Sequence, residues 1–158
     1  MTSQITPLNL TRRSVLLSLV ALNGASIAVA ASPITVQVWK DPNCGCCKDW
    51  IAHMEKNNFA TKVMDQGNNA ARARLGMPQK FASCHTALIE GYVIEGHVPA
   101  IDIQRLLKEK PQALGLAVSG MPIGSPGMDG PAYGGKHDAY QVLLIQKDGS
   151  SKVFHSYA

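Results

Sequence analysis

The sequence predicts an α/β domain, and three features support that prediction. Segments that alternate apolar and polar residues, as strands do, are separated by segments in which apolar residues recur at helical spacing. Near the C-terminus, Asp148-Gly149 lies between two apolar runs, which is a strong hairpin signal. The chain has 158 residues, a length that suits one domain.

Residues 1–30 are expected to form an export signal. They carry the adjacent pair Arg12 and Arg13, continue with a short apolar stretch, and end in an Ala-x-Ala pattern at Ala30. The stretch is much shorter than the roughly 20 residues of a membrane-spanning helix, and the whole pattern is typical of a cleaved signal. The paired arginines favour the twin-arginine route, although the Sec route also fits. Cleavage near Ala30/Ala31 leaves a mature periplasmic domain, residues 31–158, with no membrane span.

The net charge of the chain and its expected compartment limit the classes of function that the protein can have. The formal net charge of +4 falls to +2 once Arg12 and Arg13 leave with the signal. That bias is too weak to predict a nucleic-acid or membrane-surface partner, and no basic stripe is interleaved with aromatics. Export places the four cysteines in an oxidising compartment. A cysteine that stays reduced there usually takes part in redox exchange or binds a soft metal.

The first half of the mature chain reads as strand, helix, strand. Residues 34–39 alternate around β-branched side chains and predict a strand. Asp41-Pro42-Asn43 ends it, and apolar spacing from Cys47 predicts a helix that ends near residues 57–58. Residues 59–65 predict a second strand.

The second half supplies an inserted segment, a helix and a closing hairpin. The insertion is a short helix stopped by Gly76, followed by a hairpin around Glu90-Gly91. Residues 100–111 predict an amphipathic helix, and the apolar stripe comprises Ile101, Ile103, Leu106 and Leu107. A long Gly/Pro loop, residues 115–135, precedes the final hairpin. Leaving the insertion aside, the order β-α-β-α-β-β is the skeleton of a thioredoxin-like fold.

Three cysteines, Cys44, Cys46 and Cys47, fall within four positions at the start of the first predicted helix. Cys44 and Cys47 form a C-x-x-C pair, and a helix N-terminus favours thiolates, so they are redox candidates as well as metal ligands. Adjacent helical residues point about 100° apart. Cys46 and Cys47 are therefore better placed to bind different ions, with sulfurs bridging between them.

The fourth thiol, Cys84, lies in the insertion. Four thiolates suit a tetrahedral zinc site, but structural zinc usually uses two C-x-x-C knuckles and this chain has one. Thiolates near thioethers favour Cu(I). The possible secondary metal contacts are His85, His97, Met121 and Met128. Pro122 is a candidate for the cis-proline that faces the thiols in thioredoxin-like proteins, with Pro99 as its rival.

The whole pattern resembles a family of exported bacterial metal-binding proteins of formerly unknown function, which includes the copper-resistance protein CopG. The resemblance rests on "DPNCGCCKDW", "SCHTALIEGYVIEGHVPAIDIQRLL" and "GLAVSGMPIGSPGM". It implies a thioredoxin-like domain that binds copper, as a cluster of several ions, in periplasmic copper tolerance alongside other copper-handling proteins. By position, the implied ligands are Cys44, Cys46, Cys47 and Cys84. Ser119 replaces a proline that is usual in the family, at a site remote from the thiols.

Three hypotheses follow. The first is a copper-binding protein that holds Cu(I) in thiolates and cycles it with Cu(II), which would make it a copper oxidoreductase. The second is a thiol–disulfide oxidoreductase, in which Cys44 attacks and Cys47 resolves. The third is a structural domain with two disulfides, Cys44–Cys47 and Cys46–Cys84.

Overall fold

The computed structural model describes residues 32–158. The predicted export signal, residues 1–30, lies outside the described residues. Within the described part, no helix is long and apolar enough to cross a membrane.

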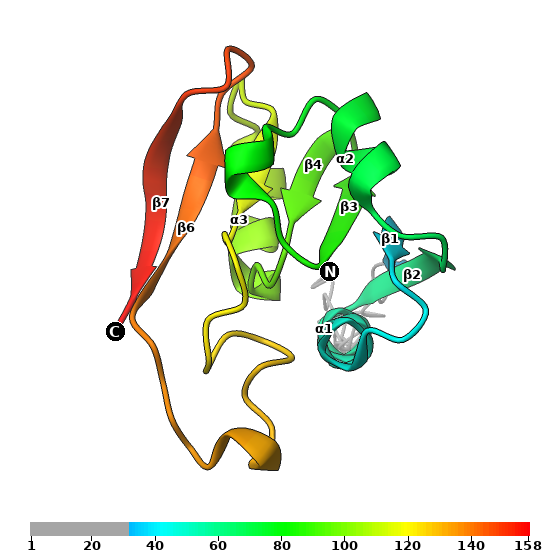
Figure 1. Cartoon of the computed structure of the whole chain (residues 1–158). Coiled ribbons are helices and arrows are strands. Elements are labelled where there is room, and N and C mark those ends of the chain that lie inside the picture. Colours follow the sequence, from blue (N-terminus) through cyan, green and yellow to red (C-terminus); the bar gives the residue numbers. More distant parts are fainter. Residues whose placement is uncertain (1–31) are drawn as a thin grey trace, which may run out of the picture. The chain divides into compact units, whose positions relative to one another are not determined.

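The described residues form seven strands, three α-helices and two short 3-10 helices, which confirms the predicted α/β class (Figure 1). The strands are β1 (Ile34–Lys40), β2 (Phe59–Met64), β3 (His85–Ile89), β4 (Tyr92–Glu95), β5 (Gly115–Ala117), β6 (Tyr140–Ile145) and β7 (Ser151–Tyr157). The helices are α1 (Gly45–Lys56), α2 (Asn69–Arg74), α3 (Ala100–Glu109), η1 (Gln79–Phe81) and η2 (Pro131–Tyr133).

All seven strands belong to one sheet, in the order β2-β1-β3-β4-β5-β6-β7. The parallel pairs are β1–β2 and β4–β5, and α1 and α3 supply the crossovers that parallel neighbours need. The other pairs are antiparallel. The hairpin β3–β4 therefore lies in the middle of the sheet, and the expectation that it is an insertion outside the core is wrong. Pairing of β3 with β1 is a long-range choice that local patterns do not reveal.

Strand β5 lies in a segment that we expected to be loop. Its three residues are buried, and it pairs with β4 on one side and β6 on the other. A Cβ atom at Gly115 would lie 1.7 Å from the carbonyl oxygen of Val93, so only glycine fits this close approach. The strand is thus defined by its neighbours rather than by its own composition.

The sheet is covered on both faces. Trp50 and Met54 of α1 and Ile103 and Leu106 of α3 pack in the larger hydrophobic core. The smaller core, on the other face, contains Met77 and Phe81 from the segment around η1, together with Val93, Ala117 and Ile145 of the sheet. The alternation of neighbouring strand residues between the two cores follows from the pleat.

One residue of the predicted α3 stripe is not in the core. Ile101 is 67% exposed, while the neighbouring Asp102 is 2% exposed. The Asp102 carboxylate is bound by the Tyr157 hydroxyl and by Nδ1 of His155, both on β7 and both at 2.7 Å. These polar partners turn Asp102 inward and leave Ile101 outside.

Candidate metal centre

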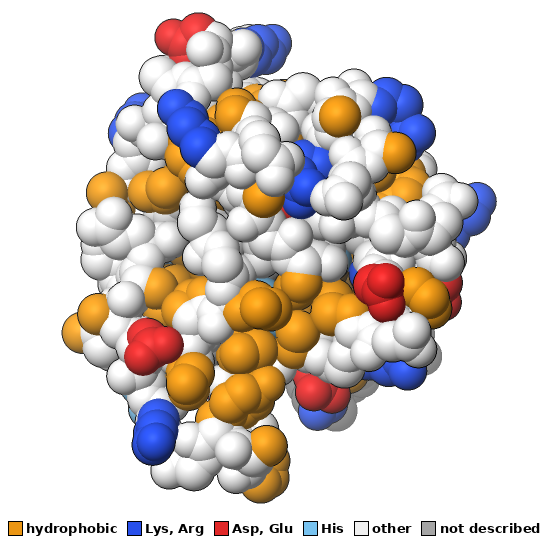
Figure 2. Space-filling model, viewed as in Figure 1, with side chains coloured by type: hydrophobic (Ala, Val, Ile, Leu, Met, Phe, Trp, Pro, Cys, Tyr) orange, Lys and Arg blue, Asp and Glu red, His pale blue; other side chains and the backbone are white. Residues whose placement is uncertain are grey.

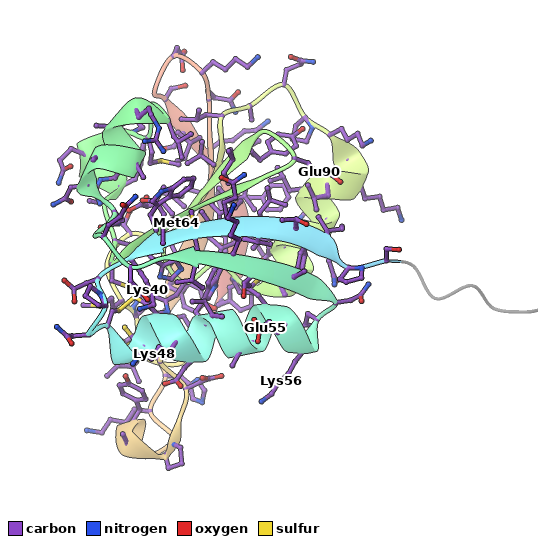
Figure 3. The ribbon with its side chains drawn as sticks, turned by 90° about the vertical axis from the view of Figure 1, so that its right-hand side faces the viewer. Lys40, Lys48, Glu55, Lys56, Met64 and Glu90 are labelled. Carbon is purple, nitrogen blue, oxygen red and sulfur yellow. A yellow bond between two sulfur atoms is a disulfide. The ribbon has the colours of Figure 1, made fainter. Side chains whose placement is uncertain are left out.

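The thiol-bearing turn follows directly from the end of β1. The carbonyl of Asp41 accepts the N–H of Cys44 at 3.1 Å, and the Asp41 side chain accepts the N–H of Asn43 at 2.8 Å. Cys44 then caps α1 in an extended conformation, without a side-chain hydrogen bond. The free N–H groups of the first helical turn, and the positive end of the helix dipole, therefore lie at the segment that carries these cysteines. In Figure 3 sulfur atoms lie near the labelled Lys40 of β1, at the end of α1 that is close to it.

Strand register brings Cys84 to this turn. Lys40, the last residue of β1, pairs with His85, the first residue of β3. Cys84 immediately precedes His85, so it meets the chain that leaves β1. The ligand atoms of the four predicted cysteine ligands all lie within 4.8 Å of one another. The predicted cysteine set is thus brought together in one place.

Two of the four thiols are joined. Cys44 and Cys47 form a disulfide with a Cα–Cα distance of 5.4 Å, and Cys46 and Cys84 are free. The Cys46 sulfur lies 3.5 Å from that of Cys44 and 3.9 Å from that of Cys84. Cys46 therefore stands between the redox pair and the distant thiol. Reduction of the disulfide is needed before all four sulfurs can act as thiolate ligands.

His97 faces the same thiol from the other side. It follows β4, and its Nε2 lies 3.0 Å from the Cys84 sulfur. Its Nδ1 lies 2.8 Å from the carbonyl oxygen of Pro126, so Nδ1 carries the proton and Nε2 presents its lone pair toward Cys84. Burial lowers the pKa of His97, although Pro126 and Asp129 oppose the shift. A neutral imidazole fixed in this way is ready to bind a metal ion.

His85 is a second imidazole beside Cys84. Its Nδ1 lies 3.4 Å from the Cys84 sulfur, and its ring packs on Trp50 with a centroid distance of 4.3 Å. Burial, with a smaller contribution from His97, lowers the pKa of His85 well below its usual range. His85 Nε2 is the one buried side-chain nitrogen or oxygen among residues 32–158 without a hydrogen-bond partner. Cys84, His85 and His97 form a compact donor group of their own.

Cys84 is a thiol rather than a thiolate in the metal-free protein. Burial raises its pKa to about 12, and the nearby Cys46 sulfur adds to the shift. A soft metal ion must therefore displace a proton to bind here. The Cys47 sulfur lies 3.6 Å from the Cys84 carbonyl oxygen, so the two segments are in direct contact.

The loop between β5 and β6 covers the first turn of α1. A Cβ atom at Gly127 would lie 2.5 Å from the Cys46 carbonyl oxygen and 2.8 Å from the Trp50 nitrogen. Met121 is 51% exposed, and its sulfur lies 4.0 Å from that of Cys46. Figure 2 shows hydrophobic side chains, a class that includes Met and Cys in its colouring, gathered where Figure 1 places this loop.

Of two expectations for this loop, the metal contact of Met128 stays a prediction and the cis-proline is wrong. Met128 accepts a hydrogen bond from the Tyr133 hydroxyl at 3.2 Å, and none of the sulfur contacts of the thiols within residues 32–158 involves it. No peptide bond in that range is cis, so neither Pro122 nor Pro99 is a cis-proline. The loop turns instead at Gly120 and Gly124, where φ is positive, and trans is the lower-energy form of an X-Pro bond.

Sequence reasoning missed the residues that support the Cys84 segment. Glu95 is fully buried at the end of β4, and Arg72 of α2 donates to its carboxylate at 3.1 Å. Away from the Cys84 segment, His53 of α1 accepts the N–H of Ala100 at the start of α3, at 3.1 Å. A charged residue at the end of an apolar strand, as in "YVIE", was the one available signal.

Fold and site together define a small α/β protein whose clustered thiols and imidazoles suit a soft metal ion. Two solved structures, both described as copper resistance protein CopG, resemble the chain. One (Form 2) is 44% identical, with a TM-score of 0.74, and the match covers 80% of this chain and 100% of that chain. The other (Form 1) is 45% identical, with a TM-score of 0.73, and the match covers 80% and 98%.

The chain therefore belongs to the family of the copper resistance protein CopG. Residues 81–128 also match a family described as "Protein of unknown function, DUF411". That stretch contains Cys84, His85, His97 and Met121, which are candidate donors, but not the three cysteines at the start of α1. Among curated proteins, none matches. The resemblance that we drew from the three sequence motifs is thus confirmed.

Proposed function

We propose that the protein binds Cu(I) in the periplasm through Cys44, Cys46, Cys47 and Cys84, and that it serves copper resistance. The observation that carries the proposal is the convergence of these four sulfurs within 4.8 Å. The copper-resistance proteins of the same family support the choice of metal, and sulfur-rich sites favour Cu(I) over harder ions.

The sulfur spacing supports a cluster rather than a single ion. With metal–sulfur bonds of about 2.3 Å, two sulfurs on one ion lie about 3.8 Å apart at tetrahedral angles. The distances from Cys46 to Cys44 and to Cys84, 3.5 and 3.9 Å, are both close to this value. Cys46 can therefore share one ion with Cys44 and another with Cys84, as a bridging thiolate. His97 lies beside Cys84 at one end of this row of sulfurs, and Met121 lies beside the central Cys46; both are further ligands in the proposal.

The proposal includes export by residues 1–30 and a thioredoxin-like core. A thiol turn between a strand and the first helix, in a sheet where β1 has a parallel and an antiparallel neighbour, supports the thioredoxin-like assignment. Cys44 and Cys47 belong to the proposed ligand set and are also a dithiol/disulfide couple. The disulfide can take two electrons, one from each of two Cu(I) ions, to give two thiolates and two Cu(II) ions, which supports cycling between Cu(I) and Cu(II).

The test is copper content and free thiols in the exported protein, purified without oxygen from copper-supplemented cells. We expect more than one copper ion per chain, and loss of copper when Cys46 and Cys84 are changed to Ser. Met121→Leu should weaken binding, whereas the matched Met128→Leu should not, because only the Met121 sulfur lies near a thiol. A protein that binds no copper after full reduction would refute the proposal.

The disulfide favours a second function, thiol–disulfide exchange with protein substrates. It joins a C-x-x-C pair at a helix N-terminus, the placement used by disulfide oxidoreductases. Against it, the Cys46 sulfur lies 3.5 Å from Cys44 and competes with any incoming thiol. If metal-free protein with Cys44 and Cys47 first reduced to thiols reduces a disulfide substrate while forming the Cys44–Cys47 disulfide, and Cys44→Ser loses this activity, the exchange function would be established instead.

A further inference from the structure

Glu95 holds both ends of the Cys84–His85 dipeptide. One carboxylate oxygen of Glu95 accepts the backbone N–H of Ser83 at 2.8 Å, and the other accepts the hydroxyl of Thr86 at 2.6 Å. These two residues flank the dipeptide on either side. Glu95 itself is fully buried on β4, whose register pairs it with Thr86. A single rigid side chain thus fixes the segment that carries one thiol and one imidazole.

Side chains from the α2 region make further hydrogen bonds to Glu95 and to the residues that it binds. Arg72 donates to the Glu95 carboxylate at 3.1 Å, and among residues 32–158 this is the one ion pair with both side chains buried. Asn68 donates to the Ser83 carbonyl at 3.1 Å and to the Thr86 hydroxyl at 3.2 Å. A buried ion pair adds little net stability, because desolvation of the two charges offsets their attraction. Its place beside the donor group therefore points to a role in geometry.

The same network reaches the other donors. The Ser83 hydroxyl donates to the carbonyl of Gly120, the residue before Met121. His97 follows Glu95 by two residues, and its Nε2 lies 3.0 Å from the Cys84 sulfur. The buried carboxylate of Glu95 is thus connected to the segments that carry Cys84, His97 and Met121.

We propose that Glu95 is a positioning residue of the metal centre. It touches no metal ion; it sets the place of Cys84 relative to the α1 thiols and to His97 by holding Ser83 and Thr86. This inference rests on the proposed function, because it concerns the geometry of that same copper site. Outer-sphere partners of this kind typically change metal affinity by about 10–100-fold when they are altered.

The test compares Glu95→Asp with a matched change elsewhere. Aspartate keeps the charge but is one methylene shorter, so it cannot reach both Ser83 and Thr86. The control is Asp102→Asn, which alters another buried carboxylate with two side-chain hydrogen bonds, both to β7. Each reduced protein is titrated with Cu(I) against bicinchoninate without oxygen, and its free energy of unfolding is measured in urea. X-ray absorption at the copper edge then reports the number of sulfur neighbours.

We expect Glu95→Asp to lower Cu(I) affinity by about tenfold or more and to lose a sulfur neighbour, while Asp102→Asn lowers stability and leaves affinity unchanged. Equal affinity in Glu95→Asp and the parent would overturn the inference, as would an equal loss in Asp102→Asn. If Glu95→Asp does not fold, the isosteric Thr86→Val removes one of the two grips, and unchanged affinity in it would overturn the inference. Absence of Cu(I) binding by the parent would instead refute the proposed function.

Discussion

Replacement of Gly127 by Ala should be among the most damaging single-methyl changes near the site. The added Cβ would lie 2.5 Å from the Cys46 carbonyl oxygen and 2.8 Å from the Trp50 nitrogen, both backbone atoms of α1. Gly127 also has φ of +87°, where a side chain costs about 1–2 kcal/mol. Overpacking against backbone adds about 1–3 kcal/mol. We therefore expect the free energy of unfolding to fall by about 2–5 kcal/mol.

Two other glycines of the same loop separate these contributions. Gly120 has φ of +72° but open space around its Cβ position, so Gly120→Ala should lose only the 1–2 kcal/mol of backbone strain, roughly. Gly130 has neither a positive φ nor a close neighbour, so Gly130→Ala should be nearly neutral. Urea unfolding of the metal-free proteins measures all three. If Gly127→Ala and Gly120→Ala lose the same stability, the loop does not pack on α1 as described.

Three more changes probe the site and its supports. Because burial raises the pKa of Cys84 to about 12, Cu(I) binding at neutral pH should release its proton; a pH-stat titration should find fewer protons released by Cys84→Ser. Burial lowers the pKa of His53 below 6.5, so the unfolded chain takes up its proton first, and metal-free protein should lose stability as pH falls below about 6.5. In thermal unfolding at pH 7.5 and 5, His53→Gln should show a smaller difference than the parent, and an unchanged difference would contradict this role. Trp50→Phe leaves the Val98 carbonyl without its indole donor, now at 2.9 Å, and should cost about 1–3 kcal/mol in urea unfolding; a neutral result would show that the bond adds nothing.

Local patterns predicted most elements of the fold but not their arrangement. The spacing of Trp50 and Met54 predicted α1, and Asp148-Gly149 predicted the β6–β7 hairpin. Strand β5 was missed because three residues that begin with glycine carry no period of their own. The central place of β3–β4 was missed because pairing with β1 depends on contacts far apart in the sequence.

For the candidate site, too, local patterns predicted some of the residues but not the contacts between distant segments. Cys44, Cys46 and Cys47 were predictable because one helical turn holds them, and Cys84 because it is the remaining thiol. Its meeting with His97 depends on the register of β4 on β3, which the pattern of side chains does not reveal. Buried charge was not predicted at all. Glu95 and Asp102 resemble ordinary surface residues until the fold supplies their partners.

The length of the loop that the Cys44–Cys47 disulfide closes determines how much this bond contributes to the stability of the domain. The two residues are three positions apart, so the bond closes a very short loop. In the chain-entropy model such a loop contributes about 2 kcal/mol, and a crosslink across the whole domain contributes more than twice that. The hydrophobic cores on the two faces of the sheet do not depend on this bond. Reduction of the disulfide to two thiols, and its re-formation, should therefore leave the scaffold around them folded.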